Sequence, residues 1–305
     1  MNVIEARGLG KRYGNTWALR DFTLALPEGH VVALVGPNGA GKTTLLNLAV
    51  GLSTPSAGMV TVLDGAPAGS RAALDGIAFV AQDAPLYKNL SVKDMVHLTT
   101  NLNWYFDQGY AIARLGELGI PLGQKSGKLS GGQQAQLALT LALARRPRLL
   151  VLDEPMAALD PLARHDFMAT VMTAIAEDGV SVLISSHVLT ELERVADYLV
   201  LLSRGQVQVA GEVDDLLASH RVLTGPATDA ESWAERLATV HVRRGEAQAH
   251  LLVRTDTSTY EVPPRFEEHP VSLEELTLAY LRVPEAASLP GPRRSSNASP
   301  REVTR

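Results

Sequence analysis

The stretch that decides the fold is Gly36-Pro37-Asn38-Gly39-Ala40-Gly41-Lys42-Thr43. The apolar run at 31–35 before it is typical of a buried parallel strand, and residues 42–51 after it are compatible with a helix. Glycines at this spacing let the backbone curl so that successive N–H groups face inward, where the helix N-terminus adds positive potential. The stretch therefore predicts a loop that binds nucleotide phosphates, with Lys42 on the β- and γ-phosphates and the Thr43 hydroxyl on Mg²⁺.

Two carboxylates, Asp153 and Glu154, end a second apolar run at 149–152. Ligands of open parallel sheets bind at the carboxyl ends of the strands. Asp153 is therefore a candidate for the Mg²⁺ shell, and Glu154 for the base that orients or deprotonates the attacking water. The alternative is a pair of acids that only caps a strand, and the phosphate loop upstream argues against it.

A third short motif, Leu129-Ser130-Gly131-Gly132-Gln133, precedes a helical pattern. Small residues with free N–H groups at a helix start form an anion site. Taken alone, the motif is equally compatible with an N-cap followed by a flexible turn. Its place between the phosphate loop and the Asp153-Glu154 pair favours the anion site.

Composition narrows the possible functions. The 305 residues suffice for one large domain and one small one. A net charge of −5 and 5% aromatic residues argue against a nucleic-acid partner. No cysteine is present, which excludes disulfides and thiolate metal sites. No apolar run reaches the roughly 18 residues of a membrane span, and no secretory signal is seen. We expect a cytoplasmic protein, peripheral on the inner face of the cell membrane through a partner.

The pattern along the chain is that of an α/β fold. Residues 1–30 read as antiparallel strands. Further strands are expected near 59–63, 77–80 and 180–185, and a buried strand at 149–152. Helical periodicity is expected at 92–104, 110–118, 133–144, 161–178 and 189–196, followed by a hairpin at 198–210. Beyond residue 218, strands near 240–242 and 251–254 and helices near 231–237 and 273–281 form a small α+β appendage.

Together the three motifs resemble the nucleotide-binding domain of ATP-binding-cassette (ABC) transporters over about residues 2–216. The resemblance implies a P-loop NTPase cassette with an antiparallel β subdomain and a helical subdomain. The expected division is a cassette at 1–217, with the helical subdomain at about 84–144, an α+β domain at 218–287 and a disordered tail at 288–305. It also implies an ATPase that works with an integral-membrane permease subunit.

In this family two cassettes dimerise head to tail, as a homodimer or as a heterodimer with a second cassette. The Gly36 loop of one and the Ser130 segment of the other then enclose each ATP. By resemblance, Tyr13 stacks on adenine, Gln82 links the metal to the helical subdomain, Asp160 lies in a loop that crosses to the other subunit, and His187 lies near the γ-phosphate.

The expected site residues follow from this resemblance. The residues expected to bind ATP are Tyr13, Gly36, Pro37, Asn38, Gly39, Ala40, Gly41, Lys42, Thr43, Thr44, Gln82, Ser130, Gly131, Gly132, Gln133 and Asp160. Mg²⁺ is expected on Thr43, Gln82 and Asp153, and catalysis on Glu154, His187 and Lys42. The sequence departs from the family pattern at 134–136 and 156–158, yet every residue needed for hydrolysis is present.

Two segments resemble the drug- and antibiotic-exporter type. Residues 83–92 match a segment on which a helix of the membrane subunit docks, and 271–280 match a C-terminal helix of that group, although an amphipathic packing helix would read the same. The expected cargo is a drug, antibiotic, lipid or peptide. The aromatic stretch at 101–106 is expected to pack inside the helical subdomain; the alternative is a contact with a partner. The alternatives are an importer ATPase, or a non-transport ABC ATPase acting on the ribosome or DNA.

Overall fold

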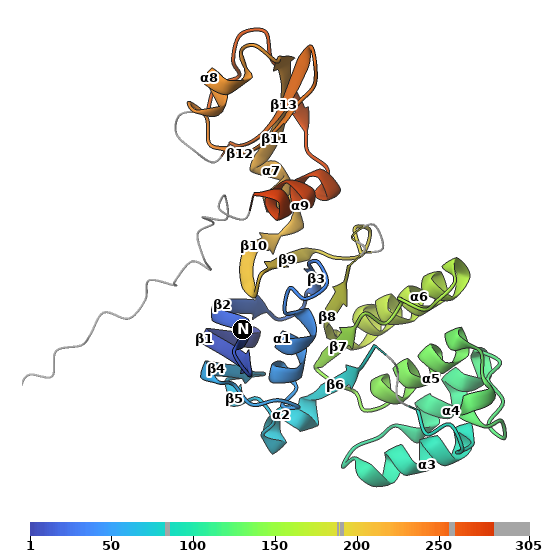
Figure 1. The fold of residues 1–305 in the computed structure, drawn as a ribbon. Helices are drawn as coiled ribbons and strands as arrows, with labels where there is room; N and C mark the ends of the chain where they lie inside the picture. Colours follow the sequence, from blue (N-terminus) through green and yellow to red (C-terminus); the bar gives the residue numbers. More distant parts are fainter. Residues whose placement is uncertain (83–85, 188, 190–191, 256–259, 284–305) are drawn as a thin grey trace, which may run out of the picture.

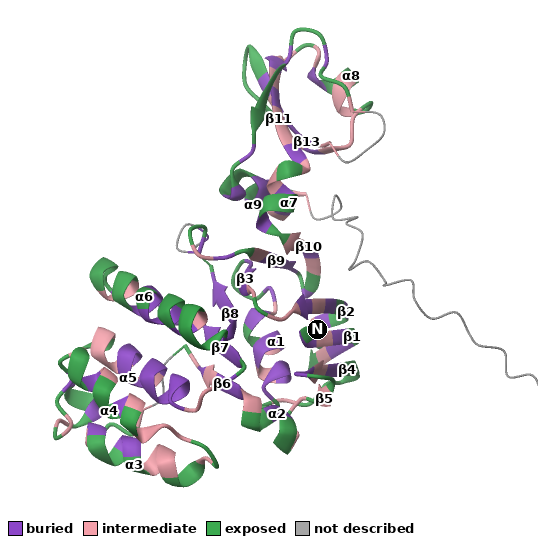
Figure 2. Cartoon of the chain, turned by 180° about the vertical axis from the view of Figure 1, so that it is seen from behind, coloured by how far each residue is buried: buried purple, intermediate pink, exposed green. Residues whose placement is uncertain are grey.

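The structure, a computed structural model, describes residues 1–82, 86–187, 189, 192–255 and 260–283. A six-stranded sheet forms its centre, with strand order β10-β9-β3-β8-β7-β6. The strands are β3 (Val31–Val35), β6 (Ile77–Val80), β7 (Leu149–Asp153), β8 (Ser181–Ser186), β9 (Tyr198–Ser203) and β10 (Gln206–Glu212). All neighbours are parallel except β9 and β10, which are antiparallel. The strands β3, β7 and β8 are buried along their whole length, as the continuous apolar runs predict (Figure 2).

The second sheet is antiparallel and covers one face of the first (Figure 1). Its order is β2-β1-β4-β5, from β1 (Asn2–Tyr13), β2 (Thr16–Pro27), β4 (Ala57–Val62) and β5 (Ala66–Pro67). The helix α1 (Lys42–Ala49) lies between the two sheets, where Leu45, Leu46 and Leu48 are buried. The short helix α2 (Arg71–Gly76) leads into β6. Burial on both sides fixes α1, and with it the loop that precedes it.

A helical subdomain projects from the edge of the central sheet (Figure 1). It contains α3 (Val92–Leu102), α4 (Gln108–Glu117), the 3₁₀ helix η1 (Ser126–Lys128) and α5 (Gly131–Leu143). Ser91 starts α3 with a capping box, and Asp107 starts α4 by accepting a hydrogen bond from the Tyr110 N–H. The long helix α6 (Pro161–Asp178) follows β7 and has proline in its first turn, as predicted. These helices agree with the predicted ones within a few residues.

The residues after β10 form a third sheet, which is antiparallel and has the strand order β12-β13-β11-β14. The elements of this C-terminal part are α7 (Val213–Ala218), β11 (His220–Pro226), α8 (Ala230–Ala234), β12 (Thr239–Arg244), β13 (Gln248–Arg254), β14 (Glu267–Pro270) and α9 (Leu273–Arg282). The helix α9 lies between this sheet and the cassette (Figure 1). There the buried Nε2 of His220 lies 2.8 Å from the buried Tyr280 hydroxyl. The sequence predicted α+β structure here but missed α7, β11 and β14.

The packing prediction for the aromatic stretch is wrong for two of its three aromatic residues. Trp104 and Tyr105 are 83% and 63% exposed, whereas Phe106 is partly buried against the core of the helical subdomain, as predicted. Trp104 instead stacks against the guanidinium of Arg71, whose carbon lies 4.4 Å from the ring centroid. The predicted tail lies outside the described residues (288–305). The predicted helix at 189–196 and docking segment at 83–92 lie partly outside them, as do the predicted helical subdomain at about 84–144 and α+β domain at 218–287. The domain boundaries at 217 and 287 stay predictions.

Candidate nucleotide-binding site

The loop between β3 and α1 has the geometry of a phosphate cradle. Two of its glycines cannot be replaced without a clash. A Cβ on Gly36 would collide with the carbonyl oxygen of Leu202, and one on Gly41 would lie 2.7 Å from Leu19 Cδ2. Gly41 also has a φ of +107°, which side-chain-bearing residues rarely adopt. The tight turn therefore requires glycine at both places and directs the first N–H groups of α1 toward the loop.

Lys42 closes back over this loop. Its Nζ donates a 2.8 Å hydrogen bond to the carbonyl of Gly36 and lies 3.4 Å from that of Pro37. The same Nζ lies 3.3 Å from Oε1 of Glu154, and the lysine is only 5% exposed. A buried ammonium needs such partners, because unpaired it would lose its hydration without compensation. Lys42 thus places a positive charge between the loop and the end of β7.

Asp153 and Glu154 lie at the carboxyl end of β7, and Ser185 of the neighbouring strand β8 joins them. The Ser185 hydroxyl donates to Asp153 Oδ1 at 2.7 Å and accepts from the Glu154 N–H at 2.8 Å. Asp153 is buried, and Glu154 has a φ of +43°, a strained value for a residue other than glycine. Ser185 therefore holds both acids in place, although no sequence pattern predicted it as a site residue.

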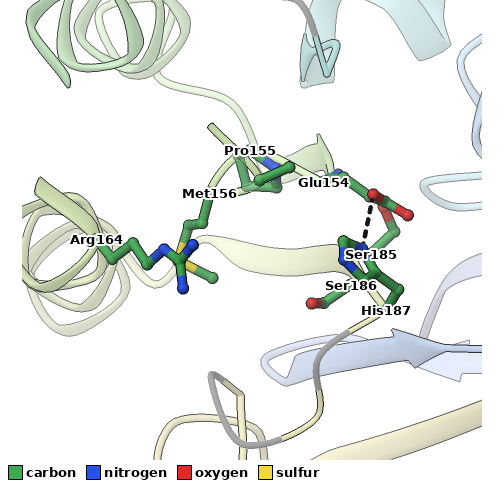
Figure 3. A pocket seen from close by; sticks show the side chains of 8 residues that line it. Glu154, Pro155, Met156, Arg164, Ser185, Ser186 and His187 are labelled. Carbon is green, nitrogen blue, oxygen red and sulfur yellow. Dashed lines mark hydrogen bonds and ion pairs between the residues drawn. The ribbon is translucent and has the colours of Figure 1, made fainter. Parts of the chain in front are cut away.

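His187 faces Glu154 from the end of β8. Its Nδ1 lies 2.9 Å from Oε2 of Glu154, as the dashed line in Figure 3 marks. Behind the pair, Met156, Arg164 and Ser186 line a small pocket of about 40 Å³ (Figure 3). Since Oε1 of Glu154 faces Lys42 and Oε2 faces His187, the carboxylate is fixed between two nitrogen-bearing side chains.

A cleft of about 580 Å³ opens above these groups. It brings together most of the predicted nucleotide residues. Its lining is Tyr13, Ala18, Asn38, Gly39, Ala40, Gly41, Lys42, Thr43, Thr44, Gln82, Glu154, Ala157 and His187. Tyr13 is 53% exposed, so a face of its ring is available for stacking, and Lys11 Nζ lies 5.2 Å from its centroid. Gly36 and Pro37 take part through the carbonyls that bind Lys42.

Ser130 to Gln133 and Asp160 do not line this cleft. Ser130 begins α5 with a capping box, in which its hydroxyl accepts from the Gln133 N–H and the Gln133 side chain accepts from the Ser130 N–H. Asp160 caps α6 by accepting from the Ala163 N–H at 2.9 Å. The two helix starts are adjacent, because a Cβ on Gly132 would lie 2.9 Å from Cβ of Ala163. These residues form a separate edge, where Ser130, Gly131 and Asp160 are exposed.

The residues of the cleft fit a nucleoside triphosphate with Mg²⁺. Backbone N–H groups at the start of α1 and the ammonium of Lys42 suit the phosphates, and Thr43 and Gln82 supply oxygen atoms to the cleft. Asp153 is buried at the end of β7 and does not line the cleft itself. No group of three or more acidic, histidine or cysteine side chains that could hold a metal occurs in the described residues. Mg²⁺ in such sites needs only one or two carboxylates, because substrate phosphates and water complete its shell.

Comparison with known proteins supports this reading. The sequence model of the ABC transporter family matches residues 19–157. The lantibiotic transport ATP-binding protein SrtF of Streptococcus pyogenes is 30% identical over 214 residues, which cover 70% of this chain and 92% of that protein. The Fe(3+) ions import ATP-binding protein FbpC of Pseudomonas fluorescens is 34% identical over 69% of this chain and 62% of its own length.

Solved structures agree with the fold. The structure of an ATP-binding subunit of an ABC transporter has a TM-score of 0.64 at 28% identity, covering 71% of this chain and 92% of that one. A dimeric cassette in a post-hydrolysis state, bound to ADP and Pi, has a TM-score of 0.62 at 26% identity over 69% of this chain and 98% of that one.

The chain belongs to the ABC transporter ATP-binding family, and it has the P-loop NTPase cassette fold. It is an ATP-binding subunit of an ABC transporter and an ATPase; such subunits dimerise and work with membrane permease components. Within the described residues, no helix is both long and apolar enough to cross a membrane.

Proposed function

We propose that the cleft is one half of a two-subunit ATPase site, completed by Ser130 to Gln133 of a second subunit. The observation that carries this proposal is the separation of the two motifs. The cleft holds the phosphate loop, Glu154 and His187, whereas the capped start of α5 lies on another, exposed edge. A helix start carries positive potential and backbone N–H groups without helical partners, so it is suited to binding the phosphates of a nucleotide held by the facing subunit.

The proposed chemistry assigns one role to each side chain. Tyr13 stacks on the adenine, and Lys42 with the loop N–H groups binds the β- and γ-phosphates. Glu154 accepts the proton of the water that attacks the γ-phosphorus, while the bond to the β–γ bridging oxygen breaks. His187 binds the γ-phosphate and holds the Glu154 carboxylate in position. Mg²⁺, held by Thr43, Gln82 and Asp153, would neutralise charge on the phosphates.

Mixing two inactive variants tests the shared site. Lys42→Ala removes the phosphate-loop lysine, and Ser130→Ala removes the cap from α5. If each site uses both subunits, a mixed dimer has one site with both defects and one intact site. A mixture of the two variants therefore recovers ATPase activity that neither has alone. If each site were built within one subunit, no ratio of the two variants would restore phosphate release.

We further propose that the subunit drives export of a drug, antibiotic, lipid or peptide. The segment at 83–92 and the C-terminal helix at 271–280 support export, and so does the relative named for lantibiotic transport. A groove of about 420 Å³ runs between β6 and the helical subdomain. Its apolar lining, which includes Phe79, Leu86, Met95 and Leu141, suits a short amphipathic helix of a membrane subunit.

An importer is the second candidate, because several relatives are named as import ATP-binding proteins. Everted membrane vesicles containing the subunit and its co-purified permease separate the two directions. ATP-driven accumulation of cargo inside everted vesicles indicates export, whereas accumulation only in right-side-out vesicles indicates import. If the subunit co-purified with ribosomes or DNA and not with a polytopic membrane protein, both the export and the import proposals would be wrong.

A further inference from the structure

A second hollow, of about 100 Å³, lies between the C-terminal sheet and α9, on elements separate from the nucleotide cleft. Its floor is apolar, with Val222 of β11, Leu252 of β13 and Ala279 of α9. Cross-strand pairing puts Val222, Leu252 and His241 in one row of the sheet. The next row on the same face holds Thr224, His250 and Arg243. We call this hollow the basic recess, because Arg243, Arg282 and two histidines line it together with one acid.

Two guanidinium groups of the basic recess, Arg243 and Arg282, differ from other arginines nearby. Arg221, Arg244 and Arg265 form ion pairs with Glu268, Glu231 and Asp229, respectively. Across the described part of the chain, neither Arg243 nor Arg282 forms a hydrogen bond or an ion pair. Both guanidinium groups are exposed, so their N–H donors beside the hollow are available to an anion.

The histidines of the basic recess also keep donors for a ligand. Nδ1 of His250 lies 2.9 Å from Oγ1 of Thr224, so its Nε2 is left for another partner. His241 is half-buried, and no hydrogen bond to it occurs among the described residues. Burial, and then the charges of Arg282 and Arg243, lower the pKa of His241. A bound anion would reverse the effect of those charges.

One acid, Glu275 of α9, also lines the basic recess. Its Oε2 is already engaged at the start of α9, where it accepts hydrogen bonds from the N–H and the hydroxyl of Ser272 at 3.2 and 3.0 Å. Arg282 lies in the last turn of α9, where a cation is favourable next to the helix dipole. That dipole explains Arg282, but it does not explain why Arg243 lies unpaired beside it.

We propose that the basic recess binds a small oxyanion of the phosphate class, either free phosphate or the phosphate of a small monoester. Arg243 and Arg282 would hold its oxygens in forked hydrogen bonds, and His241 and His250 would donate from the sheet. The recess is much smaller than the 580 Å³ nucleotide cleft, so it suits an ion of this size rather than a whole nucleotide. The site is separate from the ATPase and does not depend on the proposed direction of transport.

Histidine NMR on the full chain tests the proposal. The imidazole signals of His241 and His250 are assigned with His241→Gln and His250→Gln. Inorganic phosphate is then titrated into the wild-type chain at constant ionic strength. MgADP is present at a saturating concentration, so that phosphate does not bind at the phosphate loop. We expect both signals to shift and saturate. Acetate, which has one fewer charge, should bind more weakly. A tighter fit to glycerol phosphate than to phosphate would identify a monoester as the ligand, and equal binding would identify the free ion.

Variants make the test specific. Arg243→Gln and Arg282→Gln should each weaken phosphate binding about tenfold, because each removes a charge-assisted hydrogen bond. Both arginines are exposed, so folding should survive. Arg244→Gln is the matched control, since Arg244 is the next residue of β12 but pairs with Glu231. Unmoved signals in the wild-type chain, or equal weakening in Arg244→Gln, would overturn the proposal.

Discussion

Nδ1 of His187 lies 2.9 Å from Oε2 of Glu154, at the carboxyl ends of two adjacent strands. The other carboxylate oxygen, Oε1, lies 3.3 Å from Nζ of Lys42. One side chain therefore connects the phosphate loop to the residue that follows β8. Any ligand that binds Lys42 competes with Glu154 for that ammonium, so phosphate binding and the position of the proposed base are coupled.

Glu154→Gln should separate ATP binding from hydrolysis. The amide keeps the shape of the side chain but cannot accept the proton of water, so the hydrolysis rate should fall about 100-fold or more. ATP binding should be retained or become tighter, because Lys42 loses a competing negative charge. Phosphate release at steady state measures the first effect, and size-exclusion chromatography with ATP should detect a long-lived dimer. Glu246→Gln, at an exposed position far from the cleft, is the control. Near-normal turnover in Glu154→Gln would remove Glu154 from its assigned role.

Ser185→Ala should reduce the rate more than it reduces ATP binding. The hydroxyl binds both Asp153 and the backbone N–H of Glu154, and its removal leaves a buried carboxylate oxygen with one partner fewer. Loss of a group that orients a metal ligand typically lowers activity about 10- to 100-fold. In Ser185→Ala the kcat should therefore fall, and a higher Mg²⁺ concentration should be needed for half-maximal activity. Ser185→Thr keeps a hydroxyl and should retain part of the wild-type kcat. A purely structural role would change the unfolding midpoint and leave the Mg²⁺ dependence unaltered.

Tyr13→Ala should weaken binding of the adenine of ATP. Stacking of one base on an aromatic ring contributes about 1–3 kcal/mol, so the KM for ATP should rise at least fivefold. Tyr13→Phe keeps the ring and should bind ATP as the wild type does. Inorganic triphosphate lacks an adenine, so its inhibition constant against ATP should be the same in the wild type and in both variants. If Tyr13→Ala left the KM for ATP unchanged, the adenine would lie elsewhere in the cleft.

The elements around the phosphate loop could be predicted from sequence because their signals are local. The apolar run of β3, the glycines and the helix pattern of α1 follow one another directly, and Pro161 indicates the start of α6. Ser185 could not be predicted as a site residue in the same way. Its contacts depend on the register of β7 against β8, which pairs Asp153 with Ser185 across 32 positions of sequence.

The errors have equally specific causes. The aromatic pattern at 101–106 indicated a core, but Trp104 finds its partner in Arg71 of α2, which no local pattern connects to it. The strand β14 reads Glu-Glu-His-Pro and is exposed throughout, so it lacks the alternation of apolar and polar residues that identifies strands. It forms only because its backbone pairs with β11.

Asp107→Asn should make the free energy of unfolding depend less on pH in the acid range. Oδ1 of Asp107 accepts from the Tyr110 N–H at 2.8 Å, and Oδ2 pairs with Arg146 at 2.9 Å. The first of these bonds, then the arginine, lowers the pKa of this carboxyl in the folded state. A group whose folded pKa is lowered stabilises the protein above its unfolded pKa, and this stabilisation is lost as the pH falls.

The wild-type free energy of unfolding should therefore decline between about pH 5 and pH 3, with a contribution from Asp107. Asparagine can still cap α4, but it neither titrates nor forms an ion pair with Arg146. Asp107→Asn should therefore be less stable than the wild type at pH 7, and its free energy of unfolding should fall less between pH 5 and pH 3. Denaturant unfolding at a series of pH values measures both effects. Asp214→Asn, an exposed aspartate of α7, controls for the loss of one carboxylate. Parallel pH profiles for the wild type and Asp107→Asn would show that the carboxyl does not titrate differently in the folded and unfolded states.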